Sequence, residues 1–286
     1  MLFASSTLAA RIDRAECQIT VDFATLAQRR MPDVLLQPIG GATAVFAGTG
    51  EPFSKLVGLG FDGPIDPDAL ARVEREYDHR NAELRVELST LADNSVARLL
   101  TSRGYILAGH ENVLGLQLTP EAVARLDRER SQEIEVTPVA PAELRDWIRI
   151  VTDAFTHADT FDGPAPTEEF DPAVIERALS DAAEVPGMSM YFARRAGAIA
   201  GGGSVRMLDG LAQLSGAATL PTHRRKGVQS TLLRARLVDA ARRGCDLAVV
   251  TTEPGSKSQQ NVQRAGFALL YPRAVLIRQP KGDTHT

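Results

Sequence analysis

The segment that most restricts the fold of this chain runs from Leu220 to Leu233 and reads LPTHRRKGVQSTLL. The apolar stretch Leu211–Leu220 predicts a strand, and the apolar pattern over Ser230–Arg243 predicts a helix. Between them lie a histidine and three consecutive cations, followed by Gly227. The sequence therefore predicts a cationic, glycine-containing turn at a strand-to-helix junction, which is typical of an α/β fold.

This junction predicts an anion site. The first amides of a helix have no partner within the helix, and the helix dipole adds positive potential there, so the arrangement binds phosphate. Gly227 lets the backbone approach an anion, while Arg224, Arg225 and Lys226 supply charge-assisted hydrogen bonds. The alternative is a solvated basic turn, but the strand-and-helix context favours the phosphate site.

Composition limits the classes of function. With 286 residues, 44% hydrophobic and 24% charged, the chain is of globular type and long enough for one or two domains. A net charge of -4 argues against general binding to nucleic acid or anionic membrane. We expect no transmembrane segment, no signal peptide and a cytoplasmic location. Cys17 and Cys245 are expected to be buried and unpaired, and Cys–His metal spacing is absent, so no metal is expected.

Helix and strand patterns alternate along both halves of the chain, and we expect a domain boundary near Ser131, giving domains 1–131 and 132–286. The first half predicts helices over Leu8–Arg29, Asp66–His79, Asn94–Ser102 and Thr119–Gln132, and strands over Ala42–Ala47, Lys55–Gly60, Leu84–Leu88 and Val113–Leu118. The second half predicts further helices over Pro141–Phe155, Pro172–Ala182 and Lys257–Arg264, and strands over Met190–Arg195, Ala198–Met207, Asp246–Thr252 and Phe267–Ile277.

The two halves share a short signature. SRGYILAGHENVL and RAGFALLYPRAVL both place a Gly-aromatic pair, Gly104-Tyr105 and Gly266-Phe267, ahead of a Val-Leu pair at the same spacing. Each copy follows a helix pattern of similar length. The repeat therefore predicts two related α/β domains.

The P-loop and dinucleotide-binding patterns both fail on spacing; the glycines of AGAIAGGGS (Ala196–Ser204) lie in a predicted strand pair and indicate close backbone packing. The turn resembles instead the acyl-CoA signature R/Q-x-x-G-x-G/A of the GCN5-related N-acetyltransferase (GNAT) superfamily. Arg224, Gly227 and Gln229 occupy its marked places, although Gln229 departs from the usual Gly or Ala. The RAGF ending is similar to the family's terminal Gly-Phe, and the resemblance covers about 134–277.

This resemblance implies two GNAT-like domains, each with a mixed, mostly antiparallel central sheet flanked by helices. It implies acetyl-CoA as co-substrate, with its pyrophosphate on the backbone amides of Arg225, Lys226, Gly227, Val228, Gln229 and Ser230. The strand end near Thr219 would pair with the pantetheine and stabilise the oxyanion. The first half resembles a degenerate copy, because its equivalent loop, GFDGPID (Gly60–Asp66), has two aspartates and no basic residue.

The sequence identifies the general base and the proton donor less clearly than the cofactor site. Glu253 could act as general base through water, or it could simply begin a turn with Pro254. Many relatives place a tyrosine four residues before the terminal glycine, where this chain has Val262. Tyr191 and Tyr271 are candidates for that role or packed strand aromatics.

The polar loop Thr156–Asp171 falls where the family's substrate cover lies. His157 in it could be a base or an exposed polar residue, and Trp147 is expected in the core. The loop's carboxylates could attract a cationic amine or simply be solvated; they are Asp159, Asp162, Glu168, Glu169 and Asp171.

The leading hypothesis is an acyl-CoA-dependent N-acyltransferase that moves acetyl from acetyl-CoA to a primary amine by direct attack. Its expected partners are acetyl-CoA and an amine acceptor, without nucleic acid or membrane, in a monomer or homodimer. The alternative is a non-enzymatic acyl-CoA-binding regulatory protein, and a third class, nucleic-acid binding through His223–Arg225, is disfavoured by the acidic total.

Overall fold

The computed structural model describes every residue except 1, 130, 157–170 and 282–286. The described helices are α1 (Ser6–Ala27), α2 (Pro67–His79), α3 (Asn94–Ser102), α4 (Pro120–Arg128), η1 (Pro141–Glu143), α5 (Leu144–Thr156), α6 (Pro172–Ala182), η2 (Pro221–His223), α7 (Val228–Arg242) and α8 (Lys257–Arg264). The strands are β1 (Leu35–Ile39), β2 (Ala42–Phe46), β3 (Leu56–Val57), β4 (Leu84–Ser89), β5 (Ile106–Gln117), β6 (Ile134–Pro138), β7 (Met188–Arg195), β8 (Ala198–Leu208), β9 (Leu211–Thr219), β10 (Leu247–Thr252) and β11 (Ala268–Arg278).

These elements form two compact units that are not contiguous in sequence. The C-terminal unit includes residues 113–156 and 171–270, and the N-terminal unit includes residues 3–112 and 271–281. Strands β5 and β11 therefore each have residues in both units. The units differ in this way from contiguous domains 1–131 and 132–286, and that division stays a prediction.

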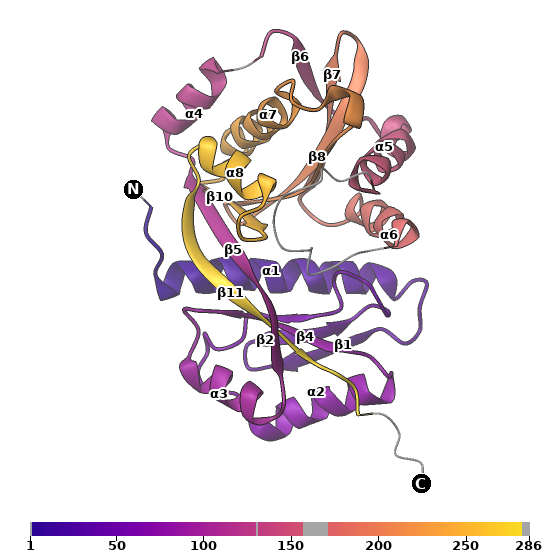
Figure 1. Ribbon diagram of the computed structural model, residues 1–286, viewed down its shortest axis with the longest axis vertical. Helices are drawn as coiled ribbons and strands as arrows, with labels where there is room; N and C mark the ends of the chain where they lie inside the picture. Colours follow the sequence, from indigo (N-terminus) through magenta and orange to yellow (C-terminus); the bar gives the residue numbers. More distant parts are fainter. Residues whose placement is uncertain (1, 130, 157–170, 282–286) are drawn as a thin grey trace. The chain divides into compact units, whose positions relative to one another are not determined.

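In the C-terminal unit the strand order is β10-β9-β8-β7-β6. Strands β6 to β9 pair antiparallel and β9 pairs parallel with β10. Helix α7 packs on β7, β8 and β9, while α5 and α6 cover the opposite face (Figure 1). Trp147 of α5 is fully buried and donates to the Tyr191 carbonyl over 3.0 Å, which confirms it as a core residue.

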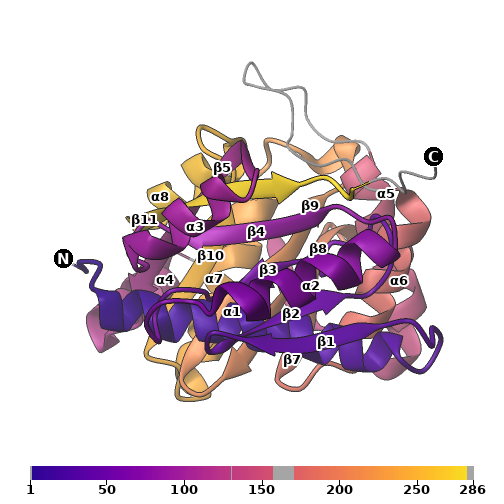
Figure 2. The same ribbon diagram turned by 90° about the horizontal axis from the view of Figure 1, so that it is seen from below.

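The N-terminal unit has the strand order β1-β2-β3-β4-β11, in which β3 and β4 are parallel and the other pairs antiparallel. Helix α1 covers one face, against β2 and β3, and α2 and α3 lie on the other (Figure 2). Its core is built largely from aliphatic residues of β3 and β4 and of helices α2 and α3.

The two units repeat one sequence of elements. Each has two parallel strands joined by a helix, β3-α2-β4 in one and β9-α7-β10 in the other, followed by a short helix. After that helix a glycine with positive φ leads toward the next strand: Gly104, at +88°, precedes β5, and Gly266, at +102°, precedes β11. This arrangement confirms the predicted α/β class, with mixed, mostly antiparallel sheets flanked by helices.

Some predicted boundaries are wrong. Strand β5 begins at Ile106, well before the predicted start at Val113. The prediction missed this first part because most of its side chains are exposed and form no buried apolar pattern. The single helix predicted from Pro141 is a 3₁₀ turn followed by α5.

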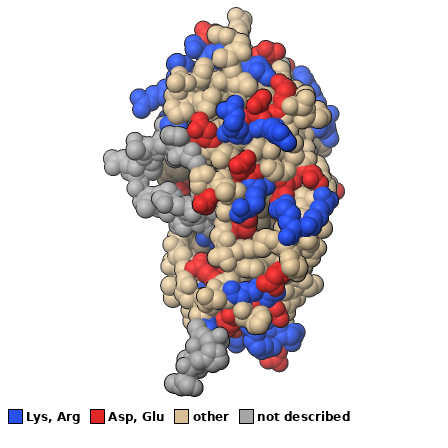
Figure 3. Space-filling model, turned by 90° about the vertical axis from the view of Figure 1, so that its right-hand side faces the viewer, with Lys and Arg blue, Asp and Glu red and all other residues tan. Residues whose placement is uncertain are grey.

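The surface carries charges of both signs. On the face drawn in Figure 3, Lys and Arg side chains are interspersed with Asp and Glu. Among the described residues, no helix is long and apolar enough to cross a bilayer.

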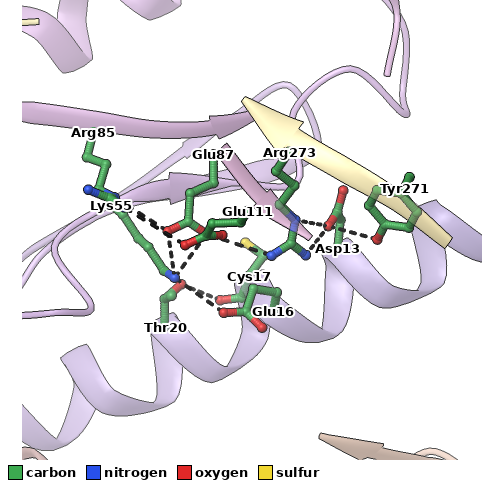
Figure 4. Close-up of polar contacts among 10 residues, drawn as sticks. All are labelled: Asp13, Glu16, Cys17, Thr20, Lys55, Arg85, Glu87, Glu111, Tyr271 and Arg273. Atoms are coloured by element: carbon green, nitrogen blue, oxygen red, sulfur yellow. Dashed lines mark hydrogen bonds and ion pairs between the residues drawn. The ribbon is translucent and has the colours of Figure 1, made fainter. Parts of the chain in front are cut away.

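A buried charge network lies in the N-terminal unit between α1 and the sheet (Figure 4). Lys55 Nζ lies 3.0 Å from both carboxylate oxygens of Glu87. Arg273 Nε donates to Asp13 over 2.8 Å, and the Tyr271 hydroxyl donates to the same carboxylate over 3.3 Å. Tyr271, at 2% exposure, is therefore a packed strand aromatic, as one of its two interpretations predicted.

Acids outnumber bases in this network. The carboxylates are Asp13, Glu16, Glu87 and Glu111, and the cations are Lys55, Arg85 and Arg273. Burial, reinforced by the neighbouring Glu87 carboxylate, raises the pKa of Glu111 to about 7. A proton on Glu111 would leave three carboxylates facing three cations.

We predict that Glu111→Gln removes a pH dependence of stability. A carboxyl whose pKa is raised by folding contributes stability that is complete below the unfolded value and is lost as pH rises through 7. The wild type should therefore lose about 1–3 kcal/mol between pH 5 and pH 8, and the variant should not. Urea unfolding at both pH values measures this. Glu135→Gln, at an exposed position of β6, is the matched control, and an unchanged slope in Glu111→Gln would contradict the prediction.

Candidate active site

The N-terminus of α7 has no side-chain cap. Six described helices begin after a residue whose side chain accepts from an amide of the first turn; these residues are Ser5, Asp66, Asp93, Thr119, Asp171 and Ser256. Helix α7 begins instead after Gly227, which has no side chain to offer. Its first amides are therefore available to an anion from outside the helix.

The turn before α7 depends on left-handed backbone. Arg225 has φ +59° and Gly227 has φ +79°. A Cβ at Gly227 would meet no atom closer than Ile134 Cδ1 at 3.9 Å, so the position has room for one. Glycine is required here for its conformation more than for close packing.

The cations of the turn are partly held by the backbone. Arg224 Nε donates to the Thr219 carbonyl over 3.3 Å, and Lys226 Nζ donates to the Thr222 carbonyl over 2.8 Å. Arg225 is exposed. The turn therefore keeps three positive charges near the uncapped end of α7.

The predicted cofactor-binding residues differ in whether their side chains or only their backbone groups are accessible to a ligand. Val228 is 2% exposed and its side chain is part of the core, so only its backbone is available. Gln229 is half-buried and Ser230 is exposed, both in the first turn of α7. Thr219 ends β9, just before the turn. The fold thus gathers the eight predicted residues, from Thr219 to Ser230, around one junction.

Strands β9 and β10 separate beside this junction. Their parallel pairing covers Leu247↔Leu211, Ala248↔Ala212 and Val249↔Gln213. Beyond these pairs β9 continues to Thr219 and β10 to Thr252. Each strand therefore has an edge without ladder partners in the other.

The end of β9 faces this opening. The Leu220 amide donates to the Ala200 carbonyl of β8 over 3.0 Å. Successive amides of a strand point to opposite edges, so the Thr219 amide points toward the opening. Its carbonyl is satisfied by Arg224 rather than by β10.

A threonine ends each of the two strands that separate here, Thr219 in β9 and Thr252 in β10. Thr219 Oγ1 and Thr252 Oγ1 are buried and, among the described residues, have no hydrogen-bond partner. A buried hydroxyl without a partner is costly, which suits a position completed by a ligand. Thr252 was not predicted as a site residue from the sequence, where its signal is its place at the end of a buried strand, beside Glu253.

A β-bulge lies in the middle of β9. Pairing with β8 shifts from Ser204↔Ser215 to Gly202↔Ala218, which sets two residues of β9, Gly216 and Ala217, against the single residue Gly203 of β8. Gly216 has φ +57°. Bulges bend a strand and redirect its backbone groups, and they occur often next to active sites.

Glu253 follows Thr252 at the end of β10 and is exposed. Its carbonyl accepts from the Ser256 amide over 3.2 Å, so the residue also begins the turn into α8. Glu253 therefore begins the turn with its backbone, and the role of its side chain as a base stays a prediction.

No described tyrosine takes the vacant place of the family's proton donor. Val262 is 6% exposed and packs in the core. The Tyr191 hydroxyl donates to Asp239 over 2.5 Å, and burial together with this carboxylate raises its pKa. Tyr271 belongs to the network of the N-terminal unit.

Most of the predicted substrate-covering loop lies outside the described residues. His157, Asp159, Asp162, Glu168 and Glu169 lie outside the described residues. Asp171, at the end of that loop, accepts from the Ala173 amide over 2.7 Å and caps α6.

The corresponding helix of the N-terminal unit begins differently. Asp66 accepts from the Asp68 amide over 3.0 Å and so caps α2 with a carboxylate. Asp62, earlier in the same loop, pairs with Arg14 over 2.9 Å. A negative charge already occupies the position that an anionic ligand would need, as the sequence of this loop predicted.

Comparison with known proteins places these features in a family. Residues 145–267 match the Acetyltransferase (GNAT) family. No curated protein sequence matches the chain significantly.

Solved structures share the fold. A GCN5-related N-acetyltransferase from Kribbella flavida is 20% identical, with 96% of this chain and 97% of that chain covered and a TM-score of 0.66. A tandem GNAT protein from the clavulanic acid biosynthesis pathway is 13% identical, covering 91% and 88%, with a TM-score of 0.59. A GCN5-related N-acetyltransferase from Sphaerobacter thermophilus is 16% identical, covering 75% and 68%, with a TM-score of 0.54.

The match contains the uncapped turn of α7, the bulge of β9 and the separation of β9 from β10, and the likeness to the tandem GNAT protein extends over both units. Residues 145–267 thus match the GNAT acetyltransferase family, and the chain shares its fold with a tandem GNAT protein.

Proposed function

We propose that this protein transfers an acetyl group from acetyl-CoA to a primary amine, and that the C-terminal unit carries the reaction. The observation that carries the proposal is the uncapped N-terminus of α7 beside an open edge of β9. A GNAT domain supports acyl-CoA-dependent N-acetyl transfer in general. The amine acceptor and the following residue roles belong to the proposal.

The cofactor would bind in two parts. The amides of Arg225–Ser230 hold the pyrophosphate, with Arg225 and Lys226 adding charge. The pantetheine extends along the open edge of β9 like an added strand and pairs with the Thr219 backbone. The hydroxyls of Thr219 and Thr252 gain partners in the same region, which would remove the cost of their unsatisfied burial.

The reaction follows from this placement. A neutral amine attacks the thioester carbon with its lone pair, so that a C–N bond forms and the carbonyl oxygen becomes an oxyanion. Amides at the open edge of β9 stabilise that oxyanion. The C–S bond then breaks, the nitrogen loses a proton through water to Glu253, and the thiolate of CoA takes up a proton. A free alkylammonium has a pKa of about 10, so a base is needed near neutral pH.

A second candidate function is a regulator that binds acyl-CoA without catalysis. The buried Val262 at the family's tyrosine position and the engaged hydroxyl of Tyr191 favour it. Release of CoA thiol with a panel of amines distinguishes the two functions, because a regulator would bind acetyl-CoA and release none.

We predict that Arg225→Ala/Lys226→Ala lowers the affinity for CoA by about 10- to 100-fold, since each charge-assisted contact contributes on the order of 1 kcal/mol or more. Isothermal titration at low and high salt measures the change, and the variant should show the weaker salt dependence. Arg242→Ala/Arg243→Ala, at the other end of the same helix, removes equal charge and should bind like the wild type. Unchanged affinity in the first variant, or no wild-type binding at millimolar acetyl-CoA, would reject the site.

We predict that Glu253→Gln lowers the rate of thiol release by about 100-fold while leaving the affinity for CoA unchanged, because a general base contributes to the rate and makes no contact with the pyrophosphate. A colorimetric assay with a thiol reagent measures the rate of CoA release, and isothermal titration measures the affinity for CoA. A variant as fast as the wild type would assign the proton transfer to water alone and Glu253 to the turn.

A further inference from the structure

Arg236 of α7 is a buried cation without a buried anion. Its side chain is 3% exposed. Nη1 donates to the Ser204 carbonyl over 2.7 Å and to the Ser215 carbonyl over 3.2 Å, and Nε donates to the Leu232 carbonyl over 3.3 Å. Within the part of the chain that the structure describes, no carboxylate pairs with this guanidinium. Buried charges are normally paired, so this arrangement calls for a specific reason.

Two of the three acceptors border the β9 bulge. Ser204 and Ser215 are the paired residues at which the β8–β9 register shifts. A bulge disrupts the ladder, and carbonyls that lose ladder partners need other donors. The guanidinium supplies them from the side of the sheet on which α7 packs, while Ser215 is exposed and Gly216 is half-buried.

The glycine run of β8 makes room for this contact. A Cβ at Gly203 would lie 3.1 Å from Arg236 Cζ and 3.0 Å from Leu232 Cδ2. At Gly201 it would lie 2.4 Å from the Ala218 carbonyl oxygen. A Cβ at Gly202 would lie 2.6 Å from Trp147 Nε1 of α5, so within the glycine run it is Gly203 that makes room for the arginine.

We propose that Arg236 is a positioning residue for acyl transfer, which holds the bulged segment of β9 in the conformation that aims its backbone at the thioester and sets a positive charge behind it. The inference rests on the function proposed above. A fixed charge in a region that excludes water acts on a developing oxyanion more strongly than one in solvent. Burial lowers the pKa of Arg236 to about 10, so the side chain is a cation at neutral pH.

If Arg236 has this role, its substitution should affect acyl transfer and not the affinity for CoA. The first turn of α7, at Val228, lies roughly 12 Å along the helix axis from Arg236, at about 1.5 Å per residue. Substitution of Arg236 should therefore spare the affinity for CoA, whose pyrophosphate contacts the first turn, and should alter the polarisation of the thioester carbonyl. A residue needed only for folding would affect both together.

The test uses the full chain and acetyl-CoA labelled with ¹³C at the thioester carbonyl. Binding to the wild type should move the carbonyl resonance downfield, because donors and positive charge polarise the bond. In Arg236→Met the shift should fall to less than half, while the dissociation constant for CoA changes by less than about threefold. Arg236→Lys keeps a charge and Arg236→Gln keeps a neutral donor, so both should give intermediate shifts.

Turnover provides a second readout. With an amine that the wild type acetylates, or with water as acceptor, Arg236→Met should lower kcat by about 100-fold with little change in KM for acetyl-CoA. Gly203→Ala, which displaces the arginine without removing it, should lower kcat to a smaller extent. Arg234→Met is the matched control on the same helix, because Arg234 pairs with Glu129 and not with the sheet.

The outcomes distinguish the role of Arg236 from the proposed acetyltransferase function. Wild-type shift and turnover in Arg236→Met would overturn the role of Arg236 alone. Joint loss of CoA affinity and melting temperature in the Met, Lys and Gln variants would make it a folding residue and also overturn the inference. If Met alone fails to fold, the Lys and Gln variants decide. A wild type that binds no acetyl-CoA would overturn the proposed function, and this inference with it.

Discussion

The functional part of this protein depends on one unmet hydrogen-bonding requirement. Parallel strands need a crossover connection, and β9 and β10 are joined through α7. The helix begins where β9 ends, so its free amides stand beside the edge that β10 leaves open. Gly227 keeps those amides uncapped, and the neighbouring cations raise the local potential. An anion at the turn and an extended chain along β9 would satisfy both sets of backbone groups at once.

The N-termini of α7 and α2 differ by one capping residue, which leaves the amides of α7 available to a ligand and satisfies an amide of α2 within the chain. Both units contain a parallel strand pair joined by a helix, yet α2 begins after Asp66, whose carboxylate caps it. The N-terminal unit instead concentrates its polar chemistry in the buried network around Glu87, where Lys55 and Arg273 pair with buried carboxylates. We infer that one unit has kept a binding role and the other a structural one.

The bulge of β9 connects several otherwise separate features of the C-terminal unit. Ser215 and Ser204 carry carbonyls that the shifted register exposes to α7, Arg236 satisfies them, and Gly203 leaves space for the guanidinium. The irregularity in β9 thereby accounts for the buried cation and for the glycine at position 203. The same helix carries the anion-binding turn, so the two ends of the proposed cofactor site share one rigid element.

Local signals were enough to predict the turn at Gly227, the helix that ends at His79 and the core position of Trp147, because backbone conformation and periodicity depend on neighbours in the chain. The Gly-aromatic repeat also predicted two related units. The sequence did not predict the site position of Thr252, the contacts of Arg236 or the exposed first part of β5. It also did not predict that parts of β5 and β11 belong to different units. Those features arise from strand register and burial, which are set by contacts between residues far apart in sequence and leave no periodic trace where they occur.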